Sequence, residues 1–253
     1  MAGAPTSILV RVQAKGGKFL ADDIGGAEVV IRDAQTGRWL GGGLATGTSS
    51  GDLKSAYTPT CSLSTIVTPS KLGVQWLEAG SNTAGLSVSL EIDRPTLLEI
   101  TAFGPMGGLQ SAHRVTTTQW IVPGQTIDQG PGFIVELPGL LVQVLDPPTH
   151  GAHEIRGVAT EVALVANVTM MCGCPISTSG PWLESDFQVA AAISPPGKPT
   201  TTVFLDYSGK TSRFLRLYQA TTLGVYQAVI TAVQKSTGNT GTGTVTFTVV
   251  PGS

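Results

Sequence analysis

Charged residues are scarce in this chain: Asp, Glu, Lys and Arg together make up 13% of its 253 residues. A typical soluble domain contains about 25%, so the polar surface is expected to consist largely of Ser, Thr, Asn, Gln and Gly. The 15 basic residues form no cluster, whereas a chain that neutralises nucleic-acid phosphates needs a concentrated basic face. The sequence therefore predicts no nucleic-acid partner and a low-charge surface suited to packing against other proteins.

Long apolar runs and an even set of cysteines are also missing. No stretch approaches the roughly 18 apolar residues of a membrane-spanning helix, so no membrane insertion is expected. The N-terminus, MAGAPTSILVRVQ, has no basic segment followed by a long apolar one, and no signal peptide is therefore visible. Three cysteines exclude complete intramolecular pairing. The compartment stays open between the cytoplasm and a mature secreted form.

No catalytic signature is present. The chain has three histidines and lacks the G-x-S-x-G pattern of a nucleophile elbow. Its glycine clusters at 41–43 and 107–108 do not open helices, so they are not phosphate cradles. The sequence predicts that the protein is not an enzyme, with an enzyme site between two domains kept as the least favoured alternative.

Glycine and proline are abundant instead, with 32 and 16 residues, and their spread along the chain favours many short strands joined by turns. Alternation of apolar and polar residues predicts strands in the first half at 7–14, 27–33, 38–46, 86–92, 97–103, 113–122 and 133–137. The same alternation predicts strands in the second half at 140–145, 160–171, 186–193, 201–207, 214–218, 224–233 and 244–250. In the first strand, Ile8, Val10 and Val12 are expected to face the core, and Arg11 and Gln13 the solvent.

Pro138 and Gly139 interrupt this pattern and predict a domain junction. The first domain, 1–138, contains a long insertion near 48–84 in which KLGVQWLEAG is expected to form one short helix. The second domain is 139–253, and its connection GNTGTG predicts a tight turn between its last two strands. The fold class is therefore all-β, with two tandem antiparallel β-sandwiches.

Two stretches resemble known families. GGAEVVIRDAQTGRWLGGGLAT resembles the start of a carboxypeptidase-regulatory or transthyretin-like sandwich, in which an A-x-V-x-I-x-D…T-G hairpin is typical. In the second domain, LGVYQA around Tyr226 resembles the tyrosine corner of immunoglobulin-like domains, with Trp182 as the expected core tryptophan. Ala228 stands where such a domain often has its second disulfide cysteine. Both resemblances imply scaffolding or interaction modules.

One segment, residues 170–175 (MMCGCP), brings together four sulfur-containing side chains, those of Met170, Met171, Cys172 and Cys174. Thiolates and thioethers are soft donors that suit copper, and thiolates also suit zinc. A C-x-C pair cannot complete a four-ligand zinc site alone.

The alternatives for these sulfurs are a copper or zinc ion, a redox role, simple core packing, and a disulfide with Cys61. Packing is favoured because Cys172 and Cys174 continue the apolar parity of residues 162–168, and a disulfide within C-x-C is the least expected. His150 and His153 are candidates for missing metal ligands, but are interpreted as polar loop residues.

The function predicted from the sequence is a non-enzymatic structural or interaction subunit that docks on a larger protein assembly, or self-assembles, through a low-charge β surface. The alternative is a soft-metal binding protein that uses Cys172, Cys174, Met170 and Met171 to hold a single copper or zinc ion. With the first function, no cofactor is expected.

Overall fold

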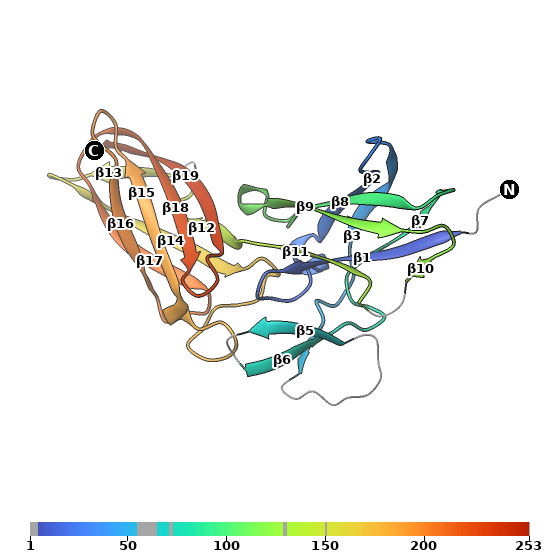
Figure 1. Ribbon diagram of the computed structural model, residues 1–253. Helices are drawn as coiled ribbons and strands as arrows, with labels where there is room; N and C mark the ends of the chain where they lie inside the picture. Colours follow the sequence, from blue (N-terminus) through green and yellow to red (C-terminus); the bar gives the residue numbers. More distant parts are fainter. Residues whose placement is uncertain (1–4, 55–64, 71–72, 129–130, 150, 253) are drawn as a thin grey trace. The chain divides into compact units, whose positions relative to one another are not determined.

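A computed structural model describes residues 5–54, 65–70, 73–128, 131–149 and 151–252. The chain divides into two compact units (Figure 1). Unit 1 comprises Met1–Pro138 and Met171–Cys174, and unit 2 comprises Gly139–Met170 and Pro175–Ser253. The described regular structure is β-strand apart from short 3-10 turns at Asp22–Ile24, Leu109–Ser111 and Glu184–Asp186. None of the described helices is long and apolar enough to cross a membrane.

The described residues of unit 1 form three sheets. Its strands are β1 (Thr6–Ala14), β2 (Ala27–Asp33), β3 (Trp39–Ala45), β4 (Asp52–Lys54), β5 (Thr65–Ser70), β6 (Gly73–Glu78), β7 (Leu86–Leu90), β8 (Thr96–Gly104), β9 (His113–Ile121), β10 (Thr126–Ile127) and β11 (Phe133–Leu137). β1 pairs with β7 on one side and with β10 and β11 on the other, and β3-β2-β8-β9 form a second sheet. A third, three-stranded sheet has the order β4-β6-β5.

The core of unit 1 confirms the inward set of the first strand and corrects its outward set. Ile8 and Val10 are fully buried, but Arg11 and Gln13 are also buried, with 5% and 4% of their surfaces exposed. β1 is a central strand with partners along both edges, and its second face is covered as well. The alternation that indicated a half-solvated strand was therefore misleading for Arg11 and Gln13.

The helix expected in the insertion is wrong. Gly73–Glu78 is strand β6, which pairs antiparallel with β5 and β4. Leu77 is fully buried and packs with Phe19 and Ala79. Cys61 lies outside the described residues.

Unit 2 is one β-sandwich whose strands form a continuous path of eight. Its strands are β12 (Leu140–Asp146), β13 (Ala152–Ile155), β14 (Thr160–Met170), β15 (Phe187–Ser194), β16 (Thr201–Tyr207), β17 (Arg213–Ala220), β18 (Gly224–Gln234) and β19 (Thr240–Pro251). Their order is β12-β14-β17-β16-β15-β18-β19-β13. β16 pairs with β15 through its first part and with β17 through Asp206 and Tyr207, so it joins the two halves.

This order is immunoglobulin-like. β12, β14 and β17 occupy the places of strands A, B and E, while β15, β18 and β19 occupy those of C, F and G. The described strand pairs are antiparallel, as predicted, except that β13 pairs with β19 in parallel and β1 pairs with β10 and β11 in parallel. The all-β sandwich class itself is confirmed.

The core of unit 2 follows the predicted alternation closely. Val162, Leu164, Ala166, Val168 and Met170 on β14 are all fully buried. The tyrosine corner is also present: the Tyr226 hydroxyl accepts a hydrogen bond of 3.0 Å from the Thr222 amide, and its ring stacks on Phe247 at 5.1 Å. Trp182 is buried as expected, with 8% exposed.

The final turn lies earlier than predicted, because β18 ends at Gln234. β19 already begins at Thr240, and the residue with positive φ is Gly238, at 73°. Asn239 is buried, and its side-chain amide donates to Gln234 Oε1 at 3.1 Å. The buried amide of Asn239 therefore closes this end of the sandwich.

Candidate functional site

The MMCGCP segment follows the end of β14. Thr169 and Pro175 form an isolated antiparallel bridge, so the chain reverses direction between them. Gly173 has φ of 75°, a backbone conformation that strongly favours glycine. This reversal brings the Cα atoms of Cys172 and Cys174 to 5.3 Å, closer than the roughly 7 Å of two residues along an extended strand.

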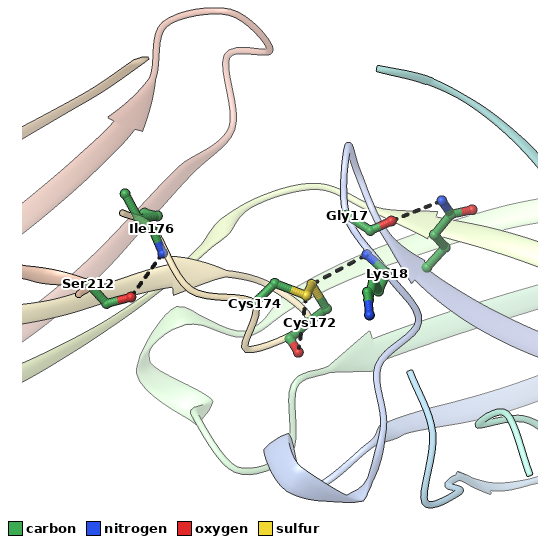
Figure 2. Close-up of a disulfide and its surroundings, with 7 residues drawn as sticks. Gly17, Lys18, Cys172, Cys174, Ile176 and Ser212 are labelled. Carbon is green, nitrogen blue, oxygen red and sulfur yellow. Dashed lines mark hydrogen bonds between the residues drawn. A yellow bond between two sulfur atoms is a disulfide. The ribbon is translucent and has the colours of Figure 1, made fainter. Parts of the chain in front are cut away.

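The two cysteines form a disulfide with each other (Figure 2). This pairing was the least expected from the sequence, because a bond between cysteines separated by one residue strains an extended backbone. The left-handed conformation of Gly173 removes that obstacle because it turns the backbone between them. Their expected burial is confirmed, since Cys172 is 1% and Cys174 8% exposed.

Within unit 1, the segment lies in close contact with the loop that follows β1. The Lys18 amide donates to Cys172 Sγ at 3.4 Å (Figure 2). A Cβ added at Gly17 would lie 3.1 Å from the same sulfur, and one at Gly173 would lie 2.6 Å from Ile24 Cγ2. The absence of side chains at these two glycines is what permits the close approach.

The disulfide changes what the segment can do chemically. While the sulfurs of Cys172 and Cys174 are bonded to each other, neither is a thiolate donor. Met170 and Met171 are fully buried beside them in sequence. Among the described residues, no group of three or more His, Cys, Asp and Glu side chains is placed to hold a metal. A copper or zinc site therefore stays a prediction for the reduced protein.

The histidines proposed as further ligands are not loop residues throughout. His150 lies outside the described residues. His153 lies on β13, where its ring meets Phe247 edge-on at 5.6 Å and its buried Nε2 has no hydrogen-bond partner among the described residues. The loop interpretation is wrong for His153, which packs on the aromatic core of unit 2.

A pocket that the sequence analysis missed lies in unit 1. It has a volume of about 700 Å³. Its walls come from β1, the segment after β3, the turn before β7, and β7 itself. Its lining residues are Leu9, Arg11, Thr46, Gly47, Thr48, Ala79, Gly80, Ser81, Asn82, Thr83, Gly85, Ser87 and Asp128. Hydroxyl, amide and glycine residues predominate.

Arg11 is the unusual member of this lining. Its Nη1 donates to the carbonyl oxygens of Thr83 and Ala84, the latter at 2.7 Å, and its guanidinium lies 5.8 Å from the centre of the Phe19 ring. Its buried Nε has no partner among the described residues. Burial lowers the pKa of Arg11 from its ordinary value, yet an arginine of this kind stays protonated. A buried cation without a carboxylate partner is costly unless something pairs with it.

One cue in the sequence points to this buried arginine. Ile8, Leu9 and Val10 are three consecutive apolar residues, and a continuous apolar run is typical of a strand covered on both faces. An arginine directly after such a run is expected to be buried too. No sequence pattern marks the remaining pocket residues, because they come together only through the strand pairing.

A second surface of interest is the outward face of three strands of unit 2, here called the uncharged face. It consists of Gln188, Ala190, Ala192 and Ser194 on β15, Val225, Gln227, Val229, Thr231 and Val233 on β18, and Thr240, Thr242, Thr244, Thr246 and Thr248 on β19. These residues alternate with the buried core residues and lie in register across the strands. No member of the set carries a charge.

Comparison with known proteins gives little further guidance. No family model matches the chain, and no curated protein matches it in sequence. Among the solved structures, Drosophila N-cadherin EC1-3 is 10% identical over 99% of this chain and 69% of its own, with a TM-score of 0.28. The fimbrial anchor protein Mfa2 from Porphyromonas gingivalis is 10% identical over 94% of this chain and 80% of its own, with a TM-score of 0.19. Similarities this weak carry no argument about function.

Proposed function

We propose that the protein is a non-enzymatic structural subunit whose uncharged face is covered by another protein surface in a larger assembly. The observation that carries the proposal is the lack of charge across β15, β18 and β19. The centres of protein interfaces are depleted in charged residues, whereas free surfaces normally mix both signs of charge. A second copy of this chain is the partner that the experiment tests.

Sedimentation velocity of the purified chain over a range of concentrations tests this function. Val229 lies in the middle of the face, between Ala192 and Thr244 in the strand register. A Val229→Lys substitution would bury an unpaired charge in the contact, which costs several kcal/mol, so association is expected to weaken by more than about 100-fold.

The matched control is Leu217→Lys on β17, where the leucine is 50% exposed and lies outside the uncharged face. It is expected to associate as the unaltered chain does. An unaltered chain that stays monomeric at every concentration would contradict self-assembly through this face. Equal weakening of association by both variants would show that an added charge at either position has this effect, and would contradict a specific role of the uncharged face.

We also infer that unit 1 belongs to the transthyretin-like or carboxypeptidase-regulatory-like sandwiches. The β2–β3 hairpin supports this inference. The Asp33 carboxylate accepts hydrogen bonds from the Gln35 and Thr36 amides at 2.8 and 3.1 Å, and Gly37 has φ of 73°. These domains are scaffolds or interaction modules, as the proposed function requires.

A second proposal concerns the reduced protein. The turn at Gly173 places Cys172 and Cys174 side by side, so reduction of the disulfide supplies two neighbouring thiols. Soft thiolate donors suit copper or zinc. Elemental analysis of protein purified under reducing conditions tests this, beside a Cys172→Ser/Cys174→Ser variant. We expect about one copper or zinc ion per chain, lost in the variant. The four ligands that a zinc site usually has would be Cys172, Cys174, Met170 and Met171. Metal-free reduced protein would contradict it.

A further inference from the structure

The Arg11 pocket has the properties of a ligand site. Its volume of about 700 Å³ falls within the range of small-molecule pockets, roughly 300–1,000 Å³. Arg11 lines it and is 5% exposed, so its guanidinium is withdrawn from solvent. An arginine in such a position offers the planar donor edge that recognises carboxylate groups.

Two lining glycines, Gly47 and Gly85, let the segments that form the pocket wall approach one another closely. A Cβ added at Gly85 would lie 2.9 Å from Leu9 Cδ1 and 3.2 Å from Arg11 Nη1, and one at Gly47 would lie 2.7 Å from Ala84 Cα. Side chains at these positions would therefore collide with the pocket wall. The two backbone carbonyls that Nη1 binds fix the position of the guanidinium without neutralising its charge.

The remaining lining residues define the ligand. Among the lining residues that the structure describes, Arg11 is the sole cation and Asp128 the sole anion. Asp128 is exposed, so it repels a second negative charge on the ligand and accepts hydrogen bonds from it. Ser81, Asn82 and Ser87 add hydroxyl and amide groups that bind polar atoms. A single carboxylate accompanied by hydrogen-bond donors matches this set.

We propose that the pocket of unit 1 binds a small molecule with one carboxylate and neighbouring hydroxyl or amino groups, with the carboxylate facing Arg11. Sugar acids and amino acids share this chemistry. The site is separate from the uncharged face and does not depend on the proposed structural function.

Protein NMR of the full ¹⁵N-labelled chain tests the proposal with two probes, D-glucuronate and glycine, and with D-glucose as the neutral counterpart of glucuronate. The amides of Thr46, Gly47, Gly80 and Gly85 are expected to shift on titration, together with the Arg11 Nε–H resonance. Glucose is expected to bind at least about tenfold more weakly, because a hydrogen bond to a charged group contributes more than one between neutral groups.

Substitution of Arg11 itself is a poor test, since the loss of its bonds to two carbonyls threatens the fold. Ser87→Trp on β7 fills the pocket instead, and Ser89→Trp is its matched control on the same strand. Ser89 is also exposed but does not line the pocket. Binding is expected to vanish in Ser87→Trp and to persist in Ser89→Trp.

The outcomes separate the two ligand sources. Shifts with glucuronate alone assign the pocket to sugar acids, and shifts with glycine alone assign it to amino acids. Asp128→Asn is expected to strengthen glucuronate binding and to weaken glycine binding. The proposal is overturned if neither probe shifts the pocket amides, if glucose binds as tightly as glucuronate, or if Ser87→Trp leaves binding unchanged.

Discussion

The two units of this chain place polar residues differently along their central strands. In unit 2, the inward face of β14 is uniformly apolar, and the outward face of β15, β18 and β19 carries no charge. Unit 1 buries Arg11 and Gln13 within its central strand. The outward face of its β3-β2-β8-β9 sheet carries charges: Arg32 lies between Trp39 and Glu99 in the register.

This difference has a physical consequence. A strand with a uniformly apolar inward face is held mainly by the burial of that face, so its outward face can carry uncharged residues that pack on a partner. A core with a buried cation depends on specific hydrogen bonds, and it leaves a polar pocket. The proposed assembly surface therefore lies on unit 2, and the proposed ligand pocket in unit 1.

The largest expected effects come from truncating the two apolar cores, which should respond alike. Leu98 on β8 and Leu164 on β14 are both fully buried. Leu98→Ala and Leu164→Ala are each expected to cost about 2–5 kcal/mol of local stability, from lost transfer energy and the cavity left behind. Amide hydrogen exchange within the altered unit measures this, because it reports stability locally.

The control for both is Leu217→Ala on β17, which is 50% exposed and should change stability by less than about 0.5 kcal/mol. A much smaller loss for Leu98→Ala than for Leu164→Ala would show that the apolar cores themselves differ. The contrast between the units would then not be confined to their polar residues.

A smaller effect is expected at the buried polar end of unit 2. Asn239 is 1% exposed. It donates to Gln234 Oε1 and accepts from the Gly139 amide at 3.2 Å. Asn239→Ala leaves these groups unsatisfied and is expected to cost about 1–3 kcal/mol. Asn167→Ala is the matched control, since the Asn167 amide makes an exposed hydrogen bond of 3.4 Å to Gln143. Urea unfolding measures the free energy of unfolding of both variants. An equal loss in the two would contradict the idea that burial makes the Asn239 hydrogen bonds more stabilising.

The tyrosine corner should contribute less. Tyr226→Phe removes the acceptor of the Thr222 amide while keeping the ring stacked on Phe247, so a loss of about 1 kcal/mol is expected. Tyr207→Phe is the control, because the Tyr207 ring also packs on a phenylalanine, here edge-on against Phe214. Thermal unfolding of the two variants checks this. A Tyr226→Phe chain as stable as the unaltered one would mean that the corner is not stabilising.

The two units also differ in how far the sequence predicted them. In unit 2, β16 has the predicted bounds and β14 ends within one residue of them, because alternation alone specifies a strand with one buried face. In unit 1, the predicted exposure of Arg11 and the helix predicted within 71–80 were wrong, since Gly73–Glu78 is strand β6. Burial of Arg11 depends on strands paired to both edges of β1, and β6 depends on its pairing with β4 and β5. The alternation of apolar and polar residues contains neither fact.

The candidate sites were likewise predictable only where local alternation determines the structure. The burial of Cys172 and Cys174 was predictable from parity, since they continue the apolar face of β14. Their disulfide was not, because it depends on the left-handed backbone of Gly173. The Arg11 pocket was missed, because its walls come from segments distant in the sequence.

The smallest expected effect tests the hairpin on which the resemblance of unit 1 is based. Hydrogen bonds from the Gln35 amide, and then from the Thr36 amide, favour the ionised form of Asp33 and lower its pKa from the ordinary value. The stabilisation is therefore present above the unfolded-state pKa and is lost as the pH falls through the lower folded-state pKa. In an NMR titration to acid pH, the Gln35 and Thr36 amides should report this low pKa. Asp33→Asn keeps an acceptor oxygen but has no carboxyl to titrate, so these amides should then be insensitive to pH. A carboxyl that titrates at or above the ordinary aspartate value would show that the turn is not held by this charge, and would remove the hairpin as support for a transthyretin-like unit 1.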